Sequence, residues 1–182
     1  MRIHGATTLA IAMAACLVVP ATSGARMKEK AAHGKNATAP DQFIKEAAVG
    51  GMAEVKLGEL AQNNAQSDAV KSFGKRMRDD HSQANSELAQ LAAQKNVTLP
   101  KDVDAKARAT YDRLSKLKGA EFDRAYMSAM LQDHRHDVAE FQSAAKSSDP
   151  DVQAFASKTL PTLQSHLDEA QQIASGSTGR GR

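Results

Sequence analysis

The feature that most restricts the fold of this 182-residue chain is a series of long segments whose apolar residues recur at helical spacing. Apolar side chains three and four positions apart share one face of an α-helix, whereas a half-buried strand alternates apolar and polar residues. No β-rich alternating segment occurs anywhere in the sequence. The pattern therefore predicts an all-α protein in which each helix buries one face against the others.

Proline, glycine and capping residues predict where these helices begin and end. Ser67 is a plausible N-cap for the second long helix, and Asp149 followed by Pro150 is typical of a cap and a first-turn proline. Pro100 and Gly119 interrupt the middle of the chain and leave room for a shorter helix between them. We expect four long helices and one short helix, at about residues 42–64, 67–95, 103–117, 120–147 and 150–174.

The lengths of the connections predict how the helices are joined. The first two long helices are separated by a few residues and form a hairpin, and the last two form another. Two helical hairpins joined by a long crossover, here containing a short helix, are the connectivity of a ferritin-like four-helix bundle. We expect this bundle over residues 41–175, and an up-down bundle with an extra short helix is the alternative.

The first 25 residues are typical of an export signal. Arg2 precedes an apolar run at 9–19, small residues follow up to Ala25, and the run is too short to cross a bilayer. Cleavage after Ala25 would give a periplasmic protein, whereas lipidation at Cys16, within a weak lipobox, would give an anchored lipoprotein. Cys16 is the only cysteine, so cleavage would exclude disulfides, cysteine-zinc sites and thiol nucleophiles.

The position of the charges excludes a nucleic-acid function despite the sequence pI of about 9.0. Residues 41–175 hold 17 Lys and Arg against 20 Asp and Glu, so the expected bundle is mildly acidic and lacks a basic groove for phosphates. Residues 26–40 hold four Lys and Arg against one Glu, and we expect a flexible basic linker there. This linker could associate with a membrane surface or an envelope protein. Residues 176–182 are expected to be a disordered tail.

Three histidines are predicted to point into the bundle. At about 100° per residue, His134 lies on the apolar stripe of its helix with Met130, whereas His136 lies on the opposite, solvated side. His81 and His166 lie in the same way on the apolar faces of the second and fourth long helices. The run from 76 to 80, in front of His81, is expected to be a solvated face with local ion pairs.

Two carboxylates can join these imidazoles. Glu54 lies at the margin of the inner face of the first helix, and Asp137 follows His134 by one turn. Counted from the two hairpin turns, the polar groups differ in height by only about 4–6 Å, at about 1.5 Å per residue. Convergence near the middle of the bundle is therefore possible, and the candidate metal ligands are His81, His134, His166, Glu54 and Asp137.

Imidazole and carboxylate together suit zinc, iron, copper or manganese. No Glu-x-x-His occurs in the chain, whereas di-iron bundles carry this pair on two helices, so a mononuclear site is favoured over an oxygen-activating di-iron centre. Two alternatives stay open: a non-catalytic envelope module whose histidines form a buried polar network, and an acid sensor. The chain has no phosphate-binding glycine loop or nucleophile elbow, so no catalytic motif supports an enzyme.

The chain resembles a family of exported bacterial proteins with a ferritin-like fold, the domain-of-unknown-function family 4142, whose members are described as outer-membrane or periplasmic proteins. The resemblance lies in GGMAEVKLGELA (50–61), VKSFGKRMRDDHSQAN (70–85), LPKDVD (99–104), LKGAEFDRAYMSAMLQDHRHDV (117–138) and FASKTLPTLQSHLDEA (155–170). It implies the ferritin-like bundle, an envelope location, and the motif histidines His81, His134 and His166. The function that we expect for the bundle is binding of a transition metal or a role in envelope stress tolerance. It implies no established activity.

Overall fold

The computed structural model describes residues 39–178, which form five α-helices and no strand. The helices are α1 (Ala39–Asn64), α2 (Asp68–Gln94), α3 (Ala105–Ser115), α4 (Gly119–Ala144) and α5 (Pro150–Thr178). The predicted all-α class is confirmed, and α5 ends four residues beyond its expected end at about 174. The predicted export signal and most of the predicted linker and tail lie outside the described residues.

Side-chain caps begin two of the helices, and one of these caps, Asp149, was predicted from the sequence. The Asp149 carboxylate accepts from the backbone N–H groups of Asp151 and Val152, and this starts α5. Asp104 caps α3 in the same way. Ser67 occupies the N-cap position of α2 with extended backbone, but its side chain makes no capping hydrogen bond.

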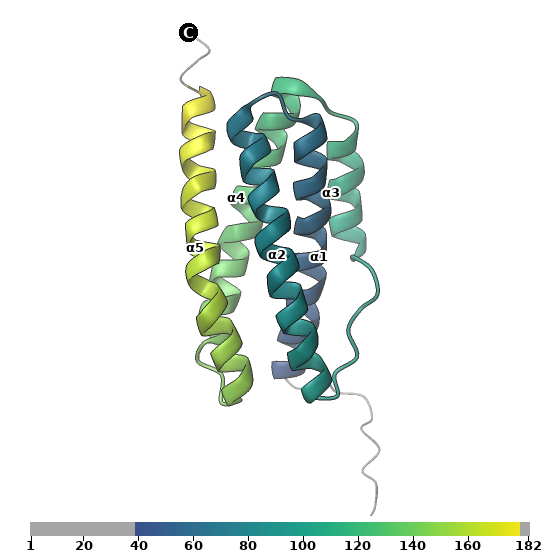
Figure 1. The fold of residues 1–182 in the computed structure, drawn as a ribbon, viewed down its shortest axis with the longest axis vertical. Helices are drawn as coiled ribbons and strands as arrows, with labels where there is room; N and C mark the ends of the chain where they lie inside the picture. The colour runs from purple at the N-terminus through teal and green to yellow at the C-terminus, as the bar shows by residue number, and fades with distance from the viewer. Residues whose placement is uncertain (1–38, 179–182) are drawn as a thin grey trace, which may run out of the picture. The chain divides into compact units, whose positions relative to one another are not determined.

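The two hairpins are joined with the connectivity of a ferritin-like bundle (Figure 1). At the start of α4, the buried Asp123 carboxylate accepts from the backbone N–H groups of Gln66 and Ser67 in the α1–α2 turn, at 3.0 and 2.9 Å. At the other end of α2, Lys95 pairs with Asp149 at the start of α5, at 2.7 Å. Helices α2 and α4 therefore begin at the same end and run parallel, because the crossover with α3 carries the chain back along the bundle.

The helices surround a core of two apolar clusters. A layer of buried polar side chains, called the polar layer below, separates them. In the bundle, α1 packs against α2 and α4, and α5 packs against α2 and α4, while α3 lies outside against α1 and α4. One cluster lies toward the α1–α2 turn and includes Phe73, Met77 and Met130. The other includes Phe43 and Leu88. No helix among the described residues is long and apolar enough to cross a lipid bilayer.

Helices α1 and α2 approach closely at a pair of glycines. A Cβ atom on Gly74 would lie 2.5 Å from the Cβ atom of Ala61, and one on Gly58 would lie 2.5 Å from the Gly74 carbonyl oxygen. Gly50, by contrast, faces open space, with nothing within 4 Å of an added Cβ. The close contact fixes α1 and α2 against each other between the polar layer and the α1–α2 turn.

Candidate metal centre

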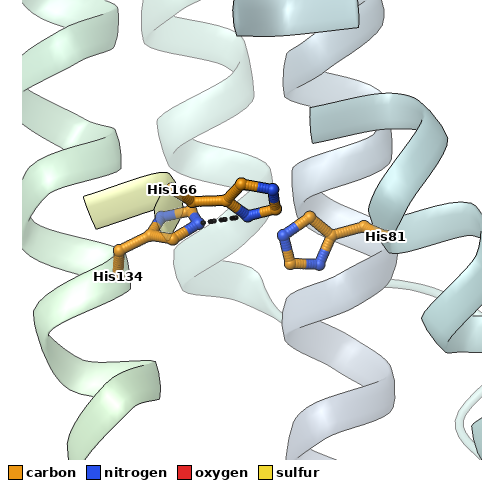
Figure 2. A group of neighbouring side chains, drawn as sticks. All are labelled: His81, His134 and His166. Atoms are coloured by element: carbon orange, nitrogen blue, oxygen red, sulfur yellow. Dashed lines mark hydrogen bonds between the residues drawn. The ribbon is translucent and has the colours of Figure 1, made fainter. Parts of the chain in front are cut away.

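The polar layer receives one residue from each of the four bundle helices. Glu54 comes from α1, His81 from α2, His134 from α4 and His166 from α5, and these side chains are buried. The ring centroids lie 5.8 Å apart for His81 and His134, and 5.4 Å apart for each of the other two pairs. Figure 2 shows the three rings turned toward one another across the bundle. The structure thus brings together the three histidines expected to point inward.

Hydrogen-bond acceptors fix the tautomers of His81 and His134. His81 Nδ1 lies 2.9 Å from Glu54 Oε2, and His134 Nδ1 lies 3.0 Å from the carbonyl oxygen of Met130. A carbonyl oxygen accepts only, so His134 Nδ1 carries the proton, and the Glu54 carboxylate requires the same of His81. In the neutral rings, the Nε2 atom of each therefore carries the lone pair.

His166 is held by an ionic network between α2 and α5. Its Nε2 atom donates to Asp80 Oδ2 at 2.8 Å, which leaves the lone pair on Nδ1. Arg76 Nε contacts the same Asp80 oxygen at 3.3 Å, and the Arg76 guanidinium also binds Glu169 on α5 at 2.5 Å. The expected local ion pair between Arg76 and Asp80 is present, but the two side chains also bind residues of α5 and so link α2 to α5.

Three lone pairs consequently face one another at the centre of the layer. His134 Nε2 and His166 Nδ1 lie 3.4 Å apart, and neither of them carries a proton to share. His81 Nε2 is buried without a hydrogen-bond partner among the described residues. One nitrogen from each ring lies within 4.8 Å of one nitrogen of the other two. A histidine that binds a metal through one ring nitrogen typically donates the N–H of the other nitrogen to an acceptor, and all three histidines have such an acceptor.

The electrostatics keep two of the imidazoles, those of His134 and His166, uncharged at neutral pH. Burial lowers the pKa of His134. Burial together with the neighbouring imidazoles lowers the pKa of His166 to about 4, although the hydrogen bond that His166 donates to Asp80 acts in the opposite direction. Burial alone would raise the pKa of Glu54, but His81 and His134 outweigh it and lower that pKa to about 2. At neutral pH, Glu54 is an anion, and His134 and His166 present lone pairs.

Asp137 lies beside Glu54 and not among the three rings. Ligand atoms of Glu54, His134 and Asp137 lie within 4.8 Å of one another and form a second group that shares His134 with the first. Burial and the charge of Glu54 raise the pKa of Asp137 to about 9. The five predicted ligands are therefore close in space but divide into an inner group of three imidazoles and an outer pair of carboxyl groups.

Comparisons with known proteins agree with the fold and name a family. The domain of unknown function DUF4142 matches residues 25–173. The chain is similar to the crystal structure of a DUF305 fragment from Deinococcus radiodurans, with a TM-score of 0.68 and 15% identity, over 78% of this chain and 99% of that chain. A search of curated proteins gives no match. Because the DUF4142 match covers well over half of the sequence, the chain belongs to the DUF4142 family.

Proposed function

We propose that this protein binds one transition-metal ion between His81, His134 and His166. The observation that carries the proposal is the convergence of three imidazole lone pairs whose outer nitrogens are all occupied by hydrogen-bond acceptors. The distance of 3.4 Å between His134 Nε2 and His166 Nδ1 matches two ligands of one tetrahedral ion. With Zn–N bonds of about 2.0–2.1 Å, such ligands lie about 3.3–3.4 Å apart.

The donor set favours some of the expected metals over others. Three neutral imidazoles suit zinc, copper and iron, whereas manganese prefers carboxylate and water ligands. Three protein ligands also leave a coordination position for water or another small ligand. Zinc and copper are the metals that this site would hold best, because copper and zinc also stand at the strong-binding end of the divalent series.

A metal-free polar network is the alternative that the same residues permit. In that state, the lone pairs of His134 Nε2 and His166 Nδ1 would repel at 3.4 Å, and His81 Nε2 would remain buried without a partner. An unsatisfied buried polar atom costs about 1–3 kcal/mol. A bound ion removes both costs, and this is why we prefer the metal site to a purely structural envelope module.

The test is the metal content of the untagged protein, purified from the producing cells and measured by elemental mass spectrometry. We expect about one ion of zinc, copper or iron per chain, and loss of it in the variant His81→Ala/His134→Ala. The matched control is His136→Ala on the same helix, because that side chain is 76% exposed and lies outside the site.

Two results would overturn the metal proposal. One is the absence of any ion from the wild-type protein even after it has been incubated with zinc, copper and iron salts. The other is equal metal content in the double variant and in the wild type. Either result would leave the three histidines as a structural network.

We also propose an exported location for the protein, because the first 25 residues have the composition of an export signal. Cell fractionation of the wild-type chain and of Cys16→Ala separates the two forms of this proposal. A periplasmic protein with a new N-terminus after Ala25 is expected in both. Membrane attachment that Cys16→Ala abolishes would indicate the lipoprotein form, and a protein that keeps Met1 in the cytoplasm would contradict export.

A further inference from the structure

A wide acidic cleft lies on the side of the bundle that the crossover covers. It has a volume of about 490 Å³ and is bounded by α1, α4 and α3 with the segment before it. Its polar lining is dominated by carboxyl groups, with two lysines and one histidine beside them. The acidic residues are Glu46, Glu54, Asp104, Asp133, Asp137 and Glu140.

The cleft connects to the histidine layer through shared walls. A smaller cavity of about 30 Å³ lies between the four bundle helices, and His81 is part of its lining. Glu54 and Asp137 line both the cavity and the cleft. A space of this size can hold a water molecule, which needs at least about 10–15 Å³. A path from the cleft to His81 along these shared walls passes the carboxyl groups of Glu54 and Asp137.

One carboxylate oxygen on this route lacks a hydrogen bond, although it lies 3.4 Å from His134 Nδ1. Glu54 is 3% exposed, and its Oε2 atom contacts His81, but its Oε1 atom has no hydrogen-bond partner among the described residues. A buried carboxylate oxygen without a donor is costly unless a ligand or water satisfies it.

We propose that the cleft is the access route of a divalent cation, and that Glu54 and Asp137 form a first binding site from which the cation passes to the three imidazoles. The inference rests on the metal site proposed above and adds the path by which it is loaded. The charged carboxylate of Glu54 attracts a hydrated cation at long range and replaces part of its water shell, whereas the inner site supplies nitrogen ligands. The outer group, which contains Glu54 and Asp137, and the inner group of three imidazoles share His134. A cation that enters from the cleft would therefore meet the outer group first.

The first test measures the rate of metal uptake. Metal-free protein is mixed with Co²⁺, a spectroscopic substitute for zinc, and the visible absorption of the imidazole-bound ion is followed by stopped flow. The variant Asp133→Asn/Glu140→Gln removes charge from the wall without changing a residue of the inner site. We expect uptake to slow by roughly tenfold at low salt, and less at high salt, because charged clefts steer ions electrostatically. The equilibrium cobalt content should not change.

The second test blocks the cleft without changing its charge. Gly50 lines the cleft and the cavity, and a Cβ atom there meets nothing within 4 Å, so Gly50→Phe places a ring in open space. We expect slower uptake with an unchanged content at equilibrium. Controls are Gly176→Phe, at an equally open position on α5, and Glu121→Gln, an exposed position on α4 outside the cleft.

The outcomes separate the two proposals. If the wild-type protein binds cobalt and both cleft variants load at the wild-type rate, the access route is wrong and the histidine site stands. If the wild-type protein binds no cobalt and no zinc at equilibrium, the histidine site itself is wrong. Slower uptake in the two cleft variants, with both controls at the wild-type rate, supports the route.

Discussion

At the scale of single residues, the partners on the outer side of the imidazoles determine what the layer can bind. His166 depends on Asp80, which Arg76 holds in place, and His134 depends on a backbone carbonyl that no substitution removes. Each partner keeps the proton on the outer nitrogen, and the inner nitrogen is then free to bind an ion. Asp80 is thus a positioning residue that touches no ion itself.

Asp80→Asn should weaken metal binding without abolishing it. The amide can still accept from His166 Nε2, but it no longer stabilises the tautomer by charge, and changes of this kind cost about 10–100-fold in metal affinity. Titration of the metal-free protein with Zn²⁺ against a competing chelator measures the change. The control is Asp79→Asn, the neighbouring residue, whose carboxylate pairs with Lys75 and Arg78. Equal affinity in Asp80→Asn and the wild type would contradict the positioning role.

At the scale of helices, the contact between α1 and α2 makes glycine substitutions position-dependent. Gly74→Ala should destabilise the protein, because the added methyl group would lie 2.5 Å from the Cβ atom of Ala61, and overpacking costs about 1–3 kcal/mol. Gly50→Ala should stabilise it by up to about 1 kcal/mol, since the position is open and alanine favours the helix. Denaturant unfolding of the two variants checks the opposite signs. If Gly74→Ala had a higher free energy of unfolding than the wild type, the two helices could move apart without cost and the prediction would be wrong.

Helical periodicity was enough to predict the helices and the three inward histidines, because rotation by about 100° per residue fixes the face of each side chain. Asp80 was missed because its role depends on α5 lying beside α2, and the spacing within α2 says nothing about its neighbour. The heights of Glu54 and the three histidines were compared only to within about one helical turn, and Asp137 was placed only as one turn beyond His134. That precision cannot separate an inner group of ligands from an outer one.

The acidic cleft could not be predicted from the same pattern. Its outer wall is the crossover, including Asp104 and α3, whose path depends on tertiary packing and not on periodicity. Four of its acidic residues, Glu46, Asp133, Asp137 and Glu140, lie on α1 and α4 at positions that a single helix would expose to solvent or place at the edge of its apolar stripe. Only the contact between α1 and α4, with α3 outside them, turns these positions into one surface.

At the scale of the whole molecule, the buried imidazoles should make the metal-free protein sensitive to acid. The pKa of His166 is about 4 in the folded protein and about 6.5 in an unfolded chain. Between these values the unfolded chain binds a proton that the folded protein excludes, so stability falls as the pH is lowered from about 6.5 to about 4. The loss attributable to this residue should reach about 3 kcal/mol.

The measurement compares the wild type with His166→Gln, both free of metal, by urea unfolding at several pH values. The comparison is needed because Asp137, with its pKa raised to about 9, acts in the opposite direction: its contribution is lost as the pH rises. We expect the stability difference between wild type and variant to shift against the wild type as the pH falls to 4. A difference independent of pH would show that His166 is not held neutral by the fold.

The polar layer also divides the bundle into two half-length cores, and this has a consequence for how the molecule unfolds. The clusters around Phe73 and Phe43 each bury apolar surface independently, and between them the helices are held together by hydrogen bonds and ion pairs. Amide hydrogen exchange should therefore resolve two regions of slow exchange in the metal-free state. An ion bound by residues from both hairpins would couple these regions, so that the amides of the two halves exchange together.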